Sequence, residues 1–116
     1  MIQKIVANAF SLQRLPDGLQ IYVNTIPAAQ VRQELGDDYD WISIVGHADT
    51  AAVFSEQLGL DVVHDRHSIK LQPGDVLYVG QLMGGRLPEG ATTLPEGFRL
   101  TWKRVSVYAE DGNASA

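Results

Sequence analysis

The chain has 116 residues, of which 45% are hydrophobic and 20% charged, proportions typical of one globular domain rather than of a disordered or fibrous protein. Its net charge of -5 argues against general binding to long nucleic acid, and the absence of cysteine excludes disulfides and thiolate zinc sites. No apolar run reaches membrane-spanning length and the N-terminus has no secretion-signal pattern, so we expect a cytoplasmic protein without a membrane partner.

The first third of the chain predicts two strands and a short helix. Residues Ile2–Asn8 are apolar and β-branched, and Gly18–Ile26 alternates apolar with polar residues, so both segments are expected to be strands. Pro27 suits the start of a helix over Ala28–Leu35, and Gly36 suits its end.

A buried strand, a turn and a second helix are expected next. The nearly continuous apolar run Trp41–Val45 predicts a strand that is covered on both faces. After His47, either Asp49 or Thr50 is expected to cap a helix that stops at Gly59. His47 therefore lies at a strand-to-helix junction, where open α/β sheets place their chemistry.

The last third predicts more strands and a long loop. Ser68–Leu71 and Val76–Gln81 flank a turn-forming cluster and are expected to form a β-hairpin. Leu82–Gly97 is a glycine- and proline-rich segment and is expected to be a mobile loop. Phe98–Tyr108 alternates as a final strand.

Together these elements predict an α/β fold class. We expect a single small domain over residues 1–108, with a mixed β-sheet of about five to six strands flanked by short helices. Residues 109–116 are expected to be a polar C-terminal tail.

His47 is the first candidate for chemistry. Gly46 permits close approach of a ligand, and the helix that follows directs its amides and positive dipole end to the same place, which favours an anion. A purely structural role, as a capping or hydrogen-bonded histidine, is the alternative. Because His64 and His67 have no metal-ligand spacing, we expect neither a metal site nor a cofactor.

Other candidate residues also admit two interpretations. Arg86 is either a solvated charge or a bidentate clamp on a phosphate. Glu89 either is simply exposed or orients Arg86 or a ribose hydroxyl, and the repeated tetrapeptide Leu-Pro-Glu-Gly leaves Glu96 as its alternative. Asn8 and Ser11 either form a turn or line the rim of a pocket.

Several short motifs follow one another in a characteristic order: Asn8-Ala9-Phe10-Ser11, Gly46-His47-x-x-Thr50, Arg66 before Ile69-Lys70-Leu71, Gln81, and Arg86-Leu87-Pro88-Glu89-Gly90. From Ile2 to about Tyr108 the chain resembles the viral ring nucleases, the type III anti-CRISPR proteins of archaeal viruses, phages and some bacterial genomes. The resemblance implies a homodimer that binds cyclic tetra-adenylate across its two-fold axis and cleaves it, which silences CRISPR effectors. A virally encoded member would act in the host cytoplasm.

The resemblance also implies residue roles. His47 matches the general acid of the family, and Arg86 and Glu89 match a loop pair that completes the catalytic site. The expected substrate-binding positions are Asn8, Ala9, Phe10, Ser11, Gln13, Gly46, Asp49, Thr50, Arg66 and Gln81. The chain departs from the pattern at Ala48-Asp49, where several relatives carry Asp-Ser, and in a loop with little room for the lid helix of many relatives.

The chemistry is consistent with these roles. An RNA-like diester can be cleaved by its own 2′-hydroxyl, so the protein must supply in-line geometry, a proton for the departing 5′-oxygen and a positive charge. His47 would give the proton and Arg86 the charge, without a metal ion. The expected product is linear di-adenylate with a 2′,3′-cyclic phosphate. Two alternatives stay open: a non-catalytic binder of a cyclic oligonucleotide or small anion, and a structural dimer in which His47 only caps a helix.

Overall fold

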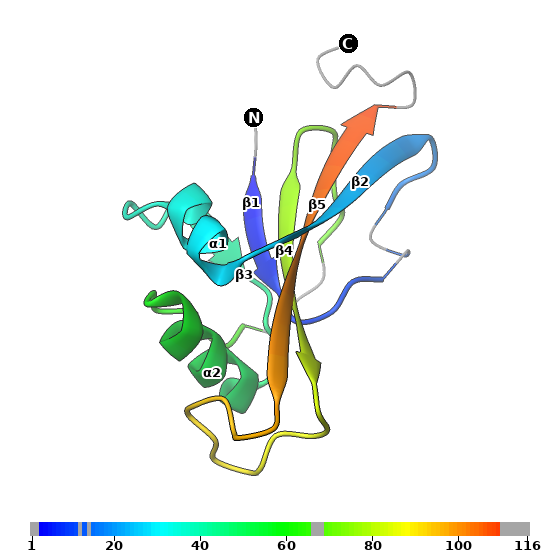
Figure 1. Ribbon diagram of the computed structural model, residues 1–116. Coiled ribbons are helices and arrows are strands. Elements are labelled where there is room, and N and C mark those ends of the chain that lie inside the picture. The colour runs from blue at the N-terminus through cyan, green and yellow to red at the C-terminus, as the bar shows by residue number, and fades with distance from the viewer. Residues whose placement is uncertain (1–2, 12, 14, 66–68, 110–116) are drawn as a thin grey trace.

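The computed structural model describes residues 3–11, 13, 15–65 and 69–109. The elements in chain order are β1 (Lys4–Ala7), β2 (Leu19–Ile26), α1 (Ala28–Leu35), β3 (Trp41–Ser43), α2 (Ala48–Leu58), β4 (Val76–Met83) and β5 (Arg99–Ala109). They form one five-stranded mixed sheet with both helices on the same face (Figure 1), which confirms the predicted α/β class and strand number.

The sheet has the strand order β2-β5-β4-β1-β3. β1 pairs in parallel with β3 and with β4, whereas β5 runs antiparallel to β4 and to β2. The carboxyl ends of the three parallel strands therefore meet at one edge of the sheet. In Figure 1 this is the lower edge, where the chain between β4 and β5 lies below α2.

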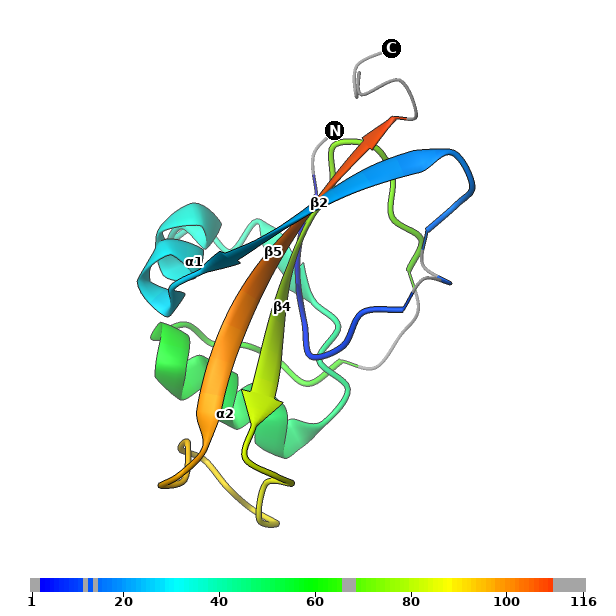
Figure 2. The same cartoon turned by 45° about the vertical axis from the view of Figure 1, so that its right-hand side comes forward.

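Two apolar clusters cover the two faces of the sheet. On the helix face, the buried rings of Phe54 and Trp102 lie 4.8 Å apart between their centroids. On the other face, a cluster around Leu77 is covered by the β1–β2 connection, including Phe10 (Figure 2). The segment after β3 contributes Ile44 to this second cluster and Val45 to the helix-face cluster, so the predicted cover on both faces is confirmed.

Helix α1 is joined to the sheet by a polar cluster around Glu34. Its carboxylate accepts hydrogen bonds from the Tyr78 hydroxyl at 2.8 Å and from the Arg104 guanidinium at 2.5 Å, and Gln30 donates a third. Burial raises the pKa of this carboxyl, but the hydrogen bonds and the positive charge of Arg104 outweigh burial and lower it overall. Burial, followed by the hydrogen bond to Glu34 and the negative charge of that residue, raises the pKa of the Tyr78 hydroxyl.

Gly80 determines how closely α2 approaches β4. A Cβ atom built at Gly80 would lie 2.5 Å from Cζ of Phe54, well inside van der Waals contact. We expect Gly80→Ala to lower the free energy of unfolding by about 1–3 kcal/mol, because the core must be overpacked or the helix displaced. Denaturant unfolding measures this cost. In a Phe54→Leu background the same change should cost clearly less, and an equal cost in both backgrounds would contradict the assigned clash.

The predicted hairpin of Ser68–Leu71 with Val76–Gln81 is wrong. The described residues of the first segment form no strand, and the second pairs with β1 and β5 instead. The buried carboxylate of Asp75 explains this outcome, because it accepts the backbone N–H of Gln72 at 2.9 Å and that of Gln3 at 3.3 Å. The turn is thereby held beside the start of β1, where parallel pairing is available.

Element boundaries differ less from the prediction. The helix over Ala28–Leu35 is confirmed at both ends. β4 extends to Met83, so the loop begins two residues later than expected, and residues 84–98 form neither helix nor strand. β5 ends at Ala109, and residues 110–116 of the predicted tail lie outside the described part of the chain. Neither helix of the described residues has the length and apolar character that a membrane span requires.

Candidate functional site

His47 occupies the N-cap position of α2 with an extended backbone, φ -134° and ψ 134°. Its carbonyl accepts the N–H of Ala51 at 3.0 Å, so the helix begins at Ala48, and the prediction that Asp49 or Thr50 caps the helix is wrong. The His47 side chain makes no capping hydrogen bond and is exposed. Its imidazole is therefore not used by the helix start.

The backbone of Gly46, directly before His47, is held by side chains from two other segments. The Gly46 N–H donates to Oδ1 of Asn8 at 3.3 Å, and Nε2 of His64 lies 3.2 Å from the Gly46 carbonyl oxygen, which accepts when that nitrogen carries the proton. A parallel bridge between Val45 and His64 brings the His64 ring into this position. Asn8, expected as a ligand contact, thus also orders the turn, and His64 has a positioning role that spacing alone did not indicate.

A pocket of about 510 Å³ opens beside His47. It is formed by the start of α2, the end of β4 and the following loop, through His47, Asp49, Thr50, Leu82, Arg86, Leu87 and Glu89. The three predicted catalytic residues therefore lie around one pocket, together with two predicted substrate-binding residues. Leu82 also lines the pocket and is not among the residues predicted from the sequence, although strand alternation places it on the same face as Gly80, toward α2.

The pocket is lined by charges of both signs. Arg86 is the cation of the lining, and Asp49 and Glu89 contribute carboxylates. The first turn of α2 adds the positive end of a helix dipole and amide groups without partners inside the helix. The geometry also distinguishes between the two copies of the tetrapeptide Leu-Pro-Glu-Gly, because Glu89 lines the pocket and Glu96 does not.

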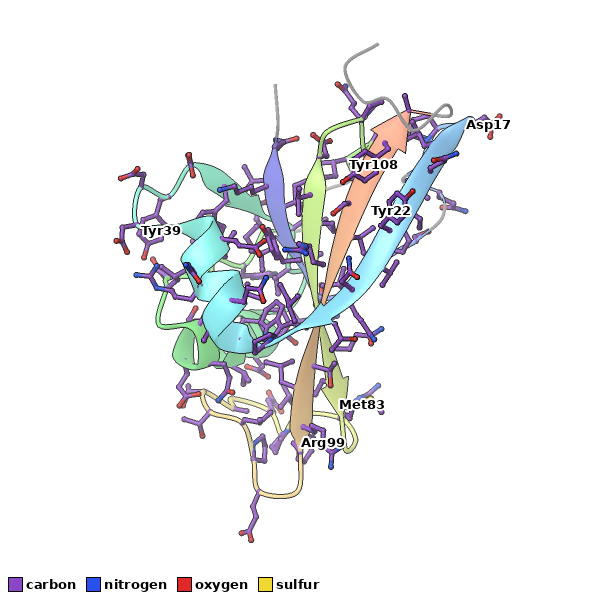
Figure 3. The ribbon with its side chains drawn as sticks, turned by 45° about the horizontal axis from the view of Figure 1, so that its top comes forward. Asp17, Tyr22, Tyr39, Met83, Arg99 and Tyr108 are labelled. Carbon is purple, nitrogen blue, oxygen red and sulfur yellow. The ribbon has the colours of Figure 1, made fainter. Side chains whose placement is uncertain are left out.

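Gln81 lies in a different hollow, of about 440 Å³, at the joined ends of β4 and β5. Figure 3 shows Met83 and Arg99 at these two strand ends, and Lys103 lines the same hollow. Side chains alternate along a strand, so Gln81 and Leu82 face opposite sides of the sheet. One copy of the chain therefore does not bring Gln81 into the pocket of His47.

The remaining predicted contacts belong to the β1–β2 connection. Ala9 is exposed, Phe10 contacts the second apolar cluster, and Oγ of Ser11 accepts the N–H of Gln13 at 3.2 Å. None of these residues lines the pocket of His47. The predicted contact Arg66 lies outside the described residues.

The part of the chain that the structure describes contains no cluster of metal-ligating side chains. Among residues 3–11, 13, 15–65 and 69–109, no group of three or more His, Cys, Asp or Glu side chains could hold a metal ion.

The fold and the pocket define a small single-domain α/β protein, with both helices on one face of a mixed sheet and a polar pocket at the carboxyl edge of the parallel strands. The chain belongs to the STIV B116-like family, which it matches over residues 4–102. The family match confirms the part of the motif resemblance that concerns a family of small viral α/β proteins.

The structure is similar to that of B116 of Sulfolobus turreted icosahedral virus (STIV). The TM-score is 0.76 at 20% sequence identity, and the match covers 90% of this chain and 98% of that chain. At this identity the similarity shows the shared fold. No curated protein matches the sequence.

Proposed function

We propose that the protein is a ring nuclease that binds cyclic tetra-adenylate as a homodimer and cleaves it to linear di-adenylate, switching off type III CRISPR signalling. The observation that carries the proposal is the pocket that gathers His47, Arg86 and Glu89 from two segments about 40 residues apart in sequence. These are the three residues that the motif resemblance assigns to catalysis. The imidazole and the guanidinium can supply the proton and the positive charge that cleavage by an internal hydroxyl needs, and the carboxylate can orient the guanidinium or the hydroxyl.

In the proposed reaction the 2′-hydroxyl of one adenylate attacks the adjacent phosphorus, and the bond to the 5′-oxygen of the next nucleotide breaks. Protonated His47 donates its proton to that departing oxygen. Arg86 stabilises the negative charge that grows on the phosphoryl oxygens, and Glu89 holds Arg86 or aligns the 2′-hydroxyl. The proton of the 2′-hydroxyl passes to solvent water, and His47 afterwards regains its proton from solvent. Each cut therefore leaves a 2′,3′-cyclic phosphate and a 5′-hydroxyl with atoms and charge in balance.

A homodimer accounts for the predicted contacts that one chain leaves apart. Gln81 faces away from the pocket of its own chain, and Ser11 does not line it. A two-fold axis presents the same residues of both copies to a ring of repeated units, which suits a cyclic tetranucleotide. The two His47 side chains would then act at opposite positions of the ring.

The deciding experiment is incubation of the purified protein with cyclic oligoadenylates of several sizes, followed by mass spectrometry of the products. We expect di-adenylate with a 2′,3′-cyclic phosphate as the main early product from the four-membered ring, and an unchanged rate after treatment with a chelator. Early products with a 5′-phosphate, or mononucleotides, would contradict the mechanism and the two-fold placement. A requirement for added divalent ion would contradict the assigned roles of His47 and Arg86.

A non-catalytic binder that sequesters the ring is the second candidate. It is favoured by the exposure of Arg86 and Glu89 and by a loop over residues 84–98 that forms no helix to enclose them. Thermal stabilisation by the ligand without any product would support this candidate against the nuclease.

A further inference from the structure

The loop between β4 and β5 must be held in place for Arg86 and Glu89 to face His47. Residues 84–98 have no regular structure, and most of their side chains are exposed. Two turns shape the loop internally, since the N–H of Ala91 donates to the carbonyl of Pro88 at 3.1 Å and that of Phe98 to the carbonyl of Pro95 at 3.0 Å. Internal turns do not determine where the loop lies relative to α2.

A hydrogen bond between the loop and α2 fixes the position of the loop relative to the helix. The backbone N–H of Gly90 donates to Oδ2 of Asp49 at 3.2 Å. Asp49 itself lines the pocket two residues after His47, and Gly90 directly follows Glu89, so this bond lies close in sequence to His47 on the helix side and to Glu89 on the loop side. Gly90 has a φ of +80°, a left-handed conformation in which glycine carries no steric cost.

The charge of Asp49 supports a role other than contact with the substrate. A carboxylate in a pocket for a phosphodiester repels the ligand unless a donor engages it. The N–H of Gly90 donates to the Asp49 carboxylate. Asp49 also lies in the first turn of α2, where the positive end of the helix dipole stabilises its negative charge. The arrangement is therefore compatible with an anionic ligand that binds next to Asp49 rather than on it.

We infer that Asp49 is a positioning residue: it latches the loop of residues 84–98 onto the start of α2 and so keeps Arg86 and Glu89 beside His47. The effect on catalysis rests on the proposed function, whereas the latch itself is a property of the unliganded protein.

The first arm of the test measures the latch without any ligand. Asp49→Ala removes the acceptor, whereas Asp49→Asn removes the charge and keeps an acceptor oxygen. Glu56→Ala and Glu56→Gln remove one negative charge from an exposed position of the same helix as matched controls. In hydrogen exchange followed by NMR, the Gly90 amide should exchange about tenfold faster in Asp49→Ala, the effect of losing one hydrogen bond. Asp49→Asn and both controls should remain near wild type, and unchanged exchange in Asp49→Ala would overturn the latch.

The second arm measures single-turnover cleavage of cyclic tetra-adenylate. Asp49→Ala should be about tenfold slower, because the loop groups no longer remain in place, and Asp49→Asn should recover most of the rate. Equal slowing in Asp49→Ala and Asp49→Asn would assign the effect to helix electrostatics and overturn the positioning role. Faster exchange with an unchanged rate would overturn it as well. If the wild-type protein leaves the ring intact, the proposed function fails, and the exchange measurement still decides the latch.

Discussion

Replacing His47 by alanine is expected to slow single-turnover cleavage of cyclic tetra-adenylate by about 10²- to 10⁴-fold, the range that a well-placed general acid contributes. The reason is that the imidazole lines the pocket, is exposed, and makes no hydrogen bond to the start of α2. Affinity should stay within about tenfold of wild type, since proton donation acts mainly in the transition state. Binding is best measured with a ring that lacks the 2′-hydroxyls, because such a ring cannot be cleaved.

The fold should survive this change. The side chain of His47 lies outside both apolar clusters, so thermal unfolding of His47→Ala is expected to match that of the wild-type protein. A fall in affinity as large as the fall in rate would show that His47 binds the ring rather than protonating the leaving oxygen. Replacement of His64 should have a smaller effect, because that ring contacts the Gly46 carbonyl and not the pocket.

Arg86→Ala is expected to slow the same reaction by about a hundredfold or more, the effect of removing one preorganised charge from a developing anion. Arg86→Lys should recover only part of the rate, because an ammonium group keeps the charge and loses the bidentate geometry. Rates measured under single-turnover conditions with saturating protein separate this effect from weaker binding.

The two copies of the tetrapeptide Leu-Pro-Glu-Gly provide a matched comparison within one loop. Glu89→Ala removes a carboxylate that lines the pocket, and Glu96→Ala removes an exposed one that does not. We expect strong slowing from the first change and almost none from the second. Equal effects of the two substitutions would defeat the assignment of Glu89, whatever the size of the effects.

Some elements were predictable because their signals are local. Proline at position 27 and glycine at position 36 delimit α1, and the structure places its ends there. Gly59, with a φ of +70°, ends α2 in the left-handed conformation that suits glycine. The position of His47 between a strand and a helix was also predictable from local signals, because an apolar run, a glycine and a helical pattern follow one another directly in the chain.

Strand pairing was not predictable in the same way. The segment Val76–Gln81 has the pattern of a hairpin strand, yet it pairs with β1, more than 70 residues earlier in the chain, through a turn held by the buried Asp75. The close approach of α2 to β4 depends on Gly80 facing Phe54, and neither residue type signals this contact alone. Strand pairing and helix packing of this kind depend on contacts between residues far apart in sequence, which local sequence patterns do not reveal.

For the candidate site, composition and local patterns were enough to indicate the residue types, the α/β class and the position of His47 at the end of a strand. The assembly of the pocket came from the topology. Parallel pairing of β1, β3 and β4 brings their carboxyl ends to one edge, and the loop after β4 thereby reaches the start of α2. The same topology turns Gln81 to the opposite face and selects Glu89 over Glu96. The two tetrapeptides have the same sequence, so local preferences cannot distinguish them, and only the fold places Glu89 and not Glu96 along the pocket.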